Sequence, residues 1–179
     1  MQEFLSLSRQ IQIRQLVRFI TITLASSIFP FMAMYYKTYF GTFWTGFLMM
    51  ITSLSGFLGT LYGGHLSDAL GRKKVVTIGS VGTSIGWLLT IFANIPGHIY
   101  PQITFLGILL VDVASCFYAP AYEAMLIDLT DLSNRKFVYT INYWFINIGV
   151  MFGAGLSGLF YDKHFLELLI ALFLANIMC

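Results

Sequence analysis

Charged residues are scarce in this sequence. Only 10% of its 179 residues are charged, whereas 58% are hydrophobic, and the mean hydropathy is +0.78. Soluble domains carry roughly 25% charged residues, so a chain of this composition cannot cover a water-facing surface. The apolar residues are concentrated in long continuous runs, which indicates that most of the chain lies in lipid.

Cysteine and histidine are too few and too dispersed for a disulfide framework or a metal site. Cys116 and Cys179 lie far apart in apolar stretches, and the three histidines have no metal-ligand spacing. The sequence also lacks nucleophile–base arrangements, phosphate-binding glycine loops and nucleic-acid-binding motifs. We therefore expect no metal, no cofactor and no nucleic-acid partner, and we expect that the chain is not an enzyme.

The amino-terminal residues do not have the form of a cleavable signal peptide, because no small-residue cleavage site follows a short apolar core. Residues 1–15 instead mix apolar residues with polar and basic ones. This pattern predicts an amphipathic segment that lies on the cytoplasmic surface of the membrane.

Long apolar runs predict the membrane spans, because a helix needs about 20 apolar residues to cross the hydrocarbon core. The runs are continuous rather than alternating, which favours helices over a barrel. We predict an all-α transmembrane protein with six spans: 16–40, 43–66, 75–95, 102–127, 138–161 and 165–179. The last run covers only about 22 Å at 1.5 Å per residue, so we expect a truncated sixth helix.

The distribution of lysine and arginine predicts the orientation, because cytoplasmic loops retain positive charge. Eight of the ten basic residues fall on one side of the predicted spans, and only Lys37 and Lys163 fall near the other. The eight are Arg9, Arg14, Arg18, Arg72, Lys73, Lys74, Arg135 and Lys136. We therefore expect a multi-pass protein of the cell membrane with a cytoplasmic amino terminus.

The predicted loop between the second and third spans carries a specific motif. Residues 63–74 read Gly-Gly-His-Leu-Ser-Asp-Ala-Leu-Gly-Arg-Lys-Lys. This stretch resembles the loop signature of the major facilitator superfamily, G-x-L-S-D-x-x-G-R-K, in the expected place. The positive-inside rule alone explains the lysines, but not the complete pattern. The residues that carry the signature are Gly64, Asp68, Gly71, Arg72 and Lys73.

The rest of the chain resembles the amino-terminal half of the LmrP-type multidrug/proton antiporters. The features that carry this resemblance are Tyr35-Tyr36, residues 94–98, Ala124 to Asp128, residues 134–136, and Tyr143-Trp144 with Asn147. The resemblance implies a twelve-helix transporter of two six-helix bundles, in which this chain is the amino-terminal bundle. It also implies export of lipophilic, often cationic drugs in exchange for protons. The implied partners are the lipid bilayer, a small-molecule substrate and a carboxy-terminal six-helix bundle that this chain lacks.

The same resemblance implies a latch on the cytoplasmic side. In that family the loop aspartate contacts a helix of the second bundle, and the loop arginine reaches an acid at the end of the fourth helix. The matching residues here are Asp68, Arg72 and Asp128. Such a latch would be closed in one state of the transport cycle and broken in the other.

Two carboxylates lie within the predicted fourth span. Asp112 is near its middle, and Glu123 is eleven residues further on. This separation is about three turns plus 20°, so both carboxylates would share one helix face across Pro120. Ionisable groups at membrane depth are costly and mark functional sites by default. We expect them to bind protons, which would be the coupling ion, or a cationic substrate; the alternative is hydrogen bonding to a neighbouring helix for packing.

The fifth span departs from the family pattern. Asn142 stands where the resemblance implies an acid before the Tyr-Trp pair, so either the proton site would have moved to the fourth span or the proton stoichiometry would differ. Asparagine cannot titrate but keeps hydrogen-bonding capacity, so Asn142 is a third candidate coupling or substrate residue. Gly149 and Gly153 form a small-xxx-small pattern that allows close helix approach. The pattern fits packing against a second bundle or packing within this one.

The preferred hypothesis is a fragment of a drug/proton antiporter that works by alternating access. One alternative is a facilitator or symporter of a small metabolite, because the loop signature is shared across the superfamily. A second alternative is a non-transporting six-helix membrane protein or an inert truncation product.

Overall fold

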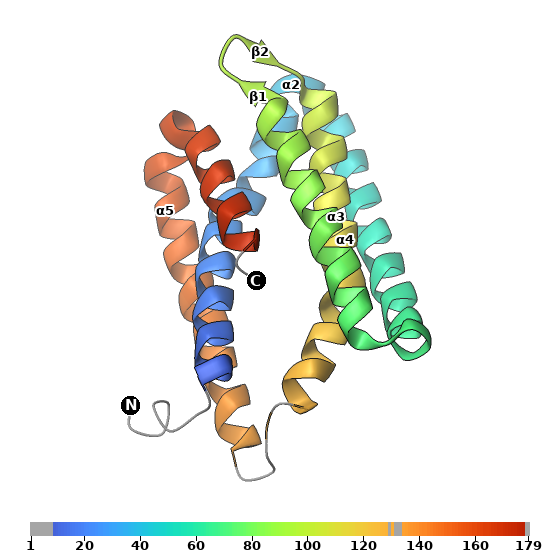
Figure 1. Ribbon diagram of the computed structural model, residues 1–179. Helices are drawn as coiled ribbons and strands as arrows, with labels where there is room; N and C mark the ends of the chain where they lie inside the picture. The colour runs from blue at the N-terminus through green and yellow to red at the C-terminus, as the bar shows by residue number, and fades with distance from the viewer. Residues whose placement is uncertain (1–8, 129, 131–133, 178–179) are drawn as a thin grey trace.

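The computed structural model describes residues 9–128, 130 and 134–177, and these residues are almost entirely helical. The helices are α2 (Arg9–Leu70), α3 (Arg72–Phe92), α4 (Pro101–Asp128) and α5 (Arg135–Ile177). A short hairpin of β1 (Asn94–Ile95) and β2 (His98–Ile99) joins α3 to α4. Figure 1 shows the helices lying roughly side by side, with the hairpin at one end of the bundle.

The helix α2 is interrupted at a single residue, Gly41. Its φ of 79° and ψ of 167° are not helical, and a positive φ is accessible to glycine at little steric cost. The chain reverses direction there, so that the later part of α2 runs back along the bundle (Figure 1). The hydroxyl of Thr45 donates to the Gly41 carbonyl at 2.8 Å, which satisfies one backbone acceptor at the turn.

The helix α5 is interrupted in the same way at His164, where φ is −128° and ψ is 29°. The side chain of His164 contacts the Glu167 carboxylate, with Nδ1 and Oε2 2.6 Å apart. The chain again turns back on itself at this point (Figure 1).

The expectation of six separate helices is therefore wrong as a count. The described residues form four helical elements, and two of these elements reverse direction at a single non-helical residue, Gly41 or His164. The physical reason is that only one residue at each reversal departs from helical φ and ψ, so the helical segments on either side adjoin directly, whereas hydropathy shows a break between apolar runs. All four helices contain an apolar segment of 18 residues or more, and His164–Ile177 is a shorter apolar helix.

The predicted segment 1–15 lies partly outside the described residues. From Arg9 onward it is helical and continuous with α2. Ile11 is only 2% exposed and packs with Leu126 of α4 and Val138 of α5. This part of the segment therefore contacts the bundle.

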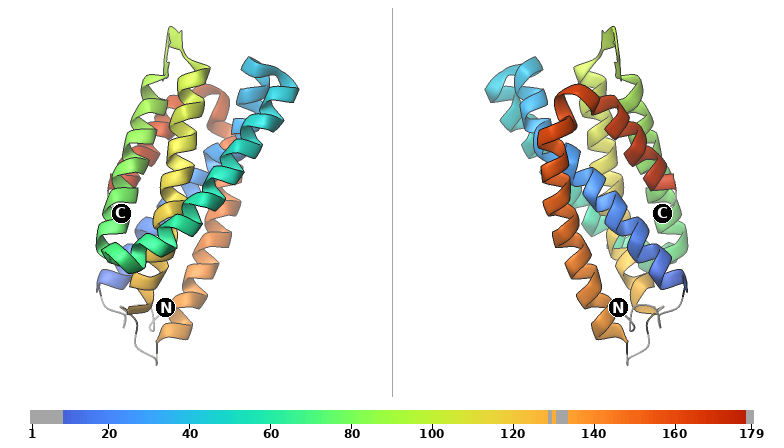
Figure 2. Two further views of the ribbon diagram at one scale, coloured as in Figure 1. Left: turned by 90° about the vertical axis from the view of Figure 1, so that its right-hand side faces the viewer. Right: turned by 90° about the vertical axis from the view of Figure 1, so that its left-hand side faces the viewer.

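The helix α4 packs between α3 and the later part of α2, as Figure 2 shows. Glycines allow this close approach: a Cβ on Gly63 of α2 would overlap the backbone of Phe117 in α4. A Cβ on Gly86 of α3 would lie 2.7 Å from the Val111 side chain. The path of α4 through the bundle therefore depends on small residues on both of its neighbours.

The helix α5 packs against the first part of α2. A Cβ on Gly149 would lie 3.1 Å from the Thr23 hydroxyl, and a Cβ on Gly153 would lie 2.7 Å from the Ser26 Cβ. The structure thus places both glycines of the small-xxx-small pattern at a contact within this bundle.

A buried polar network connects three helical elements beside the hairpin. The Tyr35 hydroxyl donates to Oδ1 of Asn94 at 2.9 Å, and Nδ2 of Asn94 donates to the Thr104 hydroxyl at 2.8 Å. Nδ2 of Asn94 also donates to the Thr90 carbonyl at 2.7 Å. The main apolar core lies next to this network and contains Ile28, Met32, Tyr36, Trp87, Ile108, Val111, Leu169 and Leu172.

Candidate functional site

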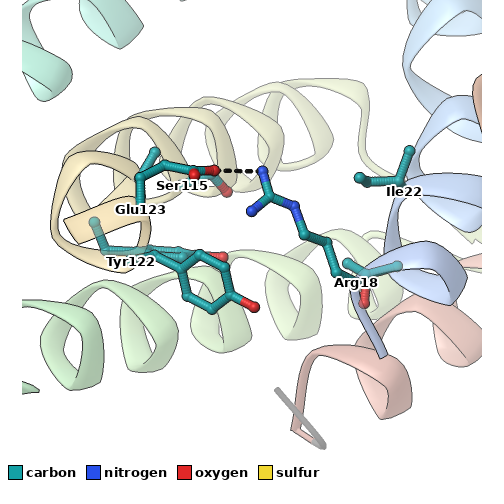
Figure 3. Close-up of a pocket in the computed structure, with 8 residues that line it drawn as sticks. Arg18, Ile22, Ser115, Tyr122 and Glu123 are labelled. Atoms are coloured by element: carbon teal, nitrogen blue, oxygen red, sulfur yellow. Dashed lines mark ion pairs between the residues drawn. The ribbon is translucent and has the colours of Figure 1, made fainter. Parts of the chain in front are cut away.

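An ion pair joins the first part of α2 to α4. Nη2 of Arg18 lies 2.7 Å from Oε1 of Glu123 (Figure 3). The guanidinium carbon of Arg18 also lies 5.3 Å from the centroid of the Tyr122 ring, within cation–π range. Both charged side chains are partly shielded, with 22% of Arg18 and 37% of Glu123 exposed.

The pair borders a cavity of about 220 Å³. Arg18, Thr21 and Ile22 of α2 line one wall, at the i, i+3, i+4 spacing of a single helix face. The opposite wall is one face of α4, with the same spacing repeated. The residues on that wall are Ser115, Tyr118, Ala119, Tyr122 and Glu123.

Two hydrogen-bond donors at this cavity are not satisfied. Nη1 of Arg18 and the Thr21 hydroxyl are buried and have no hydrogen-bond partner among the described residues. A buried donor without a partner costs about 1–3 kcal/mol. The ion pair with Glu123 therefore leaves the guanidinium only partly compensated.

The structure separates Asp112 from this cavity. Asp112 faces the later part of α2, where its Oδ2 would lie 2.6 Å from a Cβ on Gly56. Cys116 is also close to that position, at 3.2 Å. Asp112 and Glu123 therefore lie on one broad side of α4, but they face different parts of α2.

Asn142 is buried, and its Oδ1 has no hydrogen-bond partner in the described part of the chain. It lies two helical turns before Gly149 on α5, hence on the face that packs against α2. The side-chain amide of Gln15 on α2 is also buried and unpartnered among the described residues. Its role as a substrate or coupling residue stays a prediction.

The signature loop positions Arg72 against the end of α4. Gly71 precedes α3 with a φ of 87°, a conformation that favours glycine. From there Nη1 of Arg72 donates to the Asp128 carboxylate and, at 3.2 Å, to the Ala124 carbonyl. The structure thus brings together the arginine and the acid that the family resemblance pairs.

The other signature residues do not join this contact. Asp68 is exposed in the last turn of α2, and Lys73 is exposed in the first turn of α3. Gly64 is half-buried, and a Cβ there would meet nothing within 4 Å. Their roles in a latch stay predictions.

The sequence analysis does not predict the pairing of Arg18 with Glu123. The distribution of charge predicts Arg18 only as one of the basic residues near one side of the membrane. The available signal is that Arg18 and Glu123 are opposite charges within predicted apolar spans, where an ionisable side chain needs a partner.

Comparison with known families agrees with this architecture. A sequence model of the Major Facilitator Superfamily matches residues 16–177. The chain belongs to the major facilitator superfamily. This is a family of multi-pass membrane transporters, which confirms the expectation that the chain is not an enzyme.

Two curated relatives are also similar in sequence to this chain. One is a Na(+), Li(+), K(+)/H(+) antiporter of Planococcus maritimus, 27% identical over 171 residues, which are 96% of this chain and 40% of the relative. The other is an uncharacterized MFS-type transporter, YqjV, of Bacillus subtilis (strain 168). It is 32% identical over 136 residues, 75% of this chain and 32% of the relative. The chain thus spans less than half the length of either protein.

Proposed function

We propose that this chain is the amino-terminal bundle of a proton-coupled antiporter that exports cations by alternating access. The observation that carries the proposal is the placement of two carboxylates on α4. Glu123 lies at a cavity between α4 and α2, and Asp112 lies at the contact with Gly56. Carboxylates at membrane depth can bind either a proton or a cation, which is the exchange that an antiporter requires.

Two further features support the proposal. The contact of Arg72 with Asp128 resembles the latch that controls the cytoplasmic side of such transporters. One relative is named as an antiporter of Na(+), Li(+) and K(+) against protons. With the amino terminus in the cytoplasm, the latch would lie on the cytoplasmic side.

The cation could be organic or inorganic, and each class has an observation in its favour. The relative's name favours an inorganic monovalent cation. The aromatic residues Tyr118 and Tyr122 at the cavity favour a lipophilic organic cation, and the cavity of about 220 Å³ favours a small drug of this kind.

The test is proton flux in proteoliposomes that contain the full-length protein and a trapped pH indicator. After a pH gradient is imposed, addition of Na⁺, K⁺ or tetraphenylphosphonium should collapse it by exchange. We expect Glu123→Gln and Asp112→Asn to abolish the response. Glu167→Gln is the matched control, because it removes an exposed carboxylate that is 66% accessible and distant from the cavity residues in sequence.

If no cation moves protons at any pH, the antiporter proposal fails. Uptake of a metabolite without proton movement would favour the facilitator alternative. A protein that catalyses neither process would favour the non-transporting alternative.

A further inference from the structure

Two features hold the guanidinium group of Arg18. One is the Glu123 carboxylate, 2.7 Å from Nη2, and the other is the Tyr122 ring, whose centroid is 5.3 Å from the guanidinium carbon. Figure 3 shows the guanidinium on the α2 side of the cavity, facing Glu123 and Tyr122 of α4. A carboxylate and an aromatic face are the groups with which proteins recognise free organic cations. Arg18 therefore occupies a position whose chemistry suits a soluble cation of the same shape.

The cavity beside the pair limits the size of such a cation. Its volume of about 220 Å³ is smaller than the roughly 300–1,000 Å³ of pockets for drug-sized ligands. The opposite charges of Arg18 and Glu123 compensate each other, so a second cation would be repelled by the guanidinium. A cation can therefore bind to Glu123 only when Arg18 moves away from it.

Arg18 leaves some hydrogen-bonding groups at this position without a partner. Its Nη1 is buried without a hydrogen-bond partner among the described residues, and so is the neighbouring Thr21 hydroxyl. A tethered guanidinium must reach Glu123 from the α2 backbone and cannot orient all of its donors. A free cation has no such restriction, so it can compete with Arg18 for the carboxylate.

We propose that Glu123 and Tyr122 form a subsite for a small planar organic cation of the guanidinium or amidinium class, which Arg18 occupies as a tethered competitor. A substrate cation binds by displacing Arg18 from Glu123. This inference rests on the proposed function and names a substrate class for it. Binding, rather than transport, is the measurement that tests it.

The experiment is chemical rescue of Arg18→Ala with methylguanidinium in purified full-length protein. A tethered group acts at an effective concentration in the millimolar range, so its removal should tighten methylguanidinium binding by at least about tenfold. Calorimetry and the thermal unfolding midpoint provide two independent readouts, because a ligand of the folded state stabilises it. Arg18→Gln removes the charge but keeps a polar side chain, shorter than arginine, and replaces Arg18→Ala if that variant does not fold.

Three further variants isolate the subsite. Glu123→Gln should abolish the gain in binding when combined with Arg18→Ala. Tyr122→Phe retains the ring face and should preserve the gain, whereas Tyr122→Leu should reduce it. Urea and NaCl at the same concentration should produce no shift in the unfolding midpoint.

The proposal is overturned if neither Arg18 variant binds methylguanidinium more tightly than the wild type does. It is also overturned if the gain persists without Glu123, or if NaCl stabilises the Arg18 variants equally. If the variants bind methylguanidinium as expected but no cation moves protons, the subsite is established and the antiporter proposal is refuted. The two failures are thus distinguishable.

Discussion

The Arg72 side chain at the start of α3 donates from one nitrogen atom to two acceptors at the end of α4. These acceptors are the Asp128 carboxylate and the Ala124 carbonyl. The contact links the loop after α2 to the last turn of α4, although the residues are more than 50 positions apart in sequence. The side chains are 42% and 61% exposed, so the pair should stabilise the fold by no more than about 1 kcal/mol.

The first prediction concerns this contact. Arg72→Gln and Asp128→Asn should each lower thermal stability slightly, and the double variant should cost no more than the larger single effect. Each variant should also speed maleimide labelling of a cysteine placed at Ser67, which is buried in the last turn of α2. We expect Asp68→Asn to shift the labelling rate as well, because a latch controls the balance of conformational states.

Lys74→Gln is the control for this prediction, because it removes an exposed charge two residues from Arg72 that is not part of the loop signature. It should leave the labelling rate at position 67 unchanged. Equal labelling rates in the parent protein and all of these variants would show that the contact does not regulate access from this side.

The second prediction concerns the polar network beside the hairpin. Tyr35→Phe removes the hydroxyl that donates to Asn94 and contacts Thr104. It leaves Oδ1 of Asn94 buried without this donor, which should cost about 1–3 kcal/mol. Tyr100→Phe changes a tyrosine that is 50% exposed and should have little effect. Thermal unfolding in detergent measures both, and equal midpoints would contradict a stabilising role for the network.

The third prediction concerns the contact between α5 and α2. Gly153→Ala places a Cβ 2.7 Å from that of Ser26, which should force the helices apart and cost about 1–3 kcal/mol. Gly155→Ala is a matched control, because it is the same substitution two residues away and a Cβ there meets nothing within 4 Å. It should stabilise the helix by up to about 1 kcal/mol. Unfolding midpoints that fall in the opposite order would show that this contact is not close in the membrane.

The sequence predicted local features well and contacts between distant residues poorly. It located the reversals at Gly41 and near His164, because glycine and polar residues interrupt the apolar runs there. It could not show that each reversal needs only one non-helical residue, since hydropathy does not report backbone angles. The helical count of six followed from that limitation.

For the candidate site too, the sequence predicted local placement but not contacts between distant residues. Helical periodicity placed Asp112 and Glu123 on one side of α4, and the family resemblance paired Arg72 with Asp128. Neither could show that Glu123 faces Arg18 while Asp112 faces Gly56. That difference depends on how α2 and α4 rotate about their axes, which packing of the whole bundle decides.

The last prediction tests whether the Asp112 carboxylate itself, rather than the packing around it, is required for proton-driven transport. Asp112→Asn should abolish proton-driven transport while leaving expression intact, because asparagine keeps the shape of the side chain but cannot bind a proton. Gly56→Ala should reproduce part of this loss, since its Cβ would lie 2.6 Å from Oδ2 of Asp112 and displace the carboxylate. Gly46→Ala adds the same methyl group elsewhere on α2, where nothing lies within 4 Å, and should leave transport unchanged. Initial rates of proton flux in proteoliposomes measure all three variants. Full activity in Asp112→Asn would exclude Asp112 as the coupling site, whereas loss in Gly46→Ala would show that any bulk added to α2 disturbs transport.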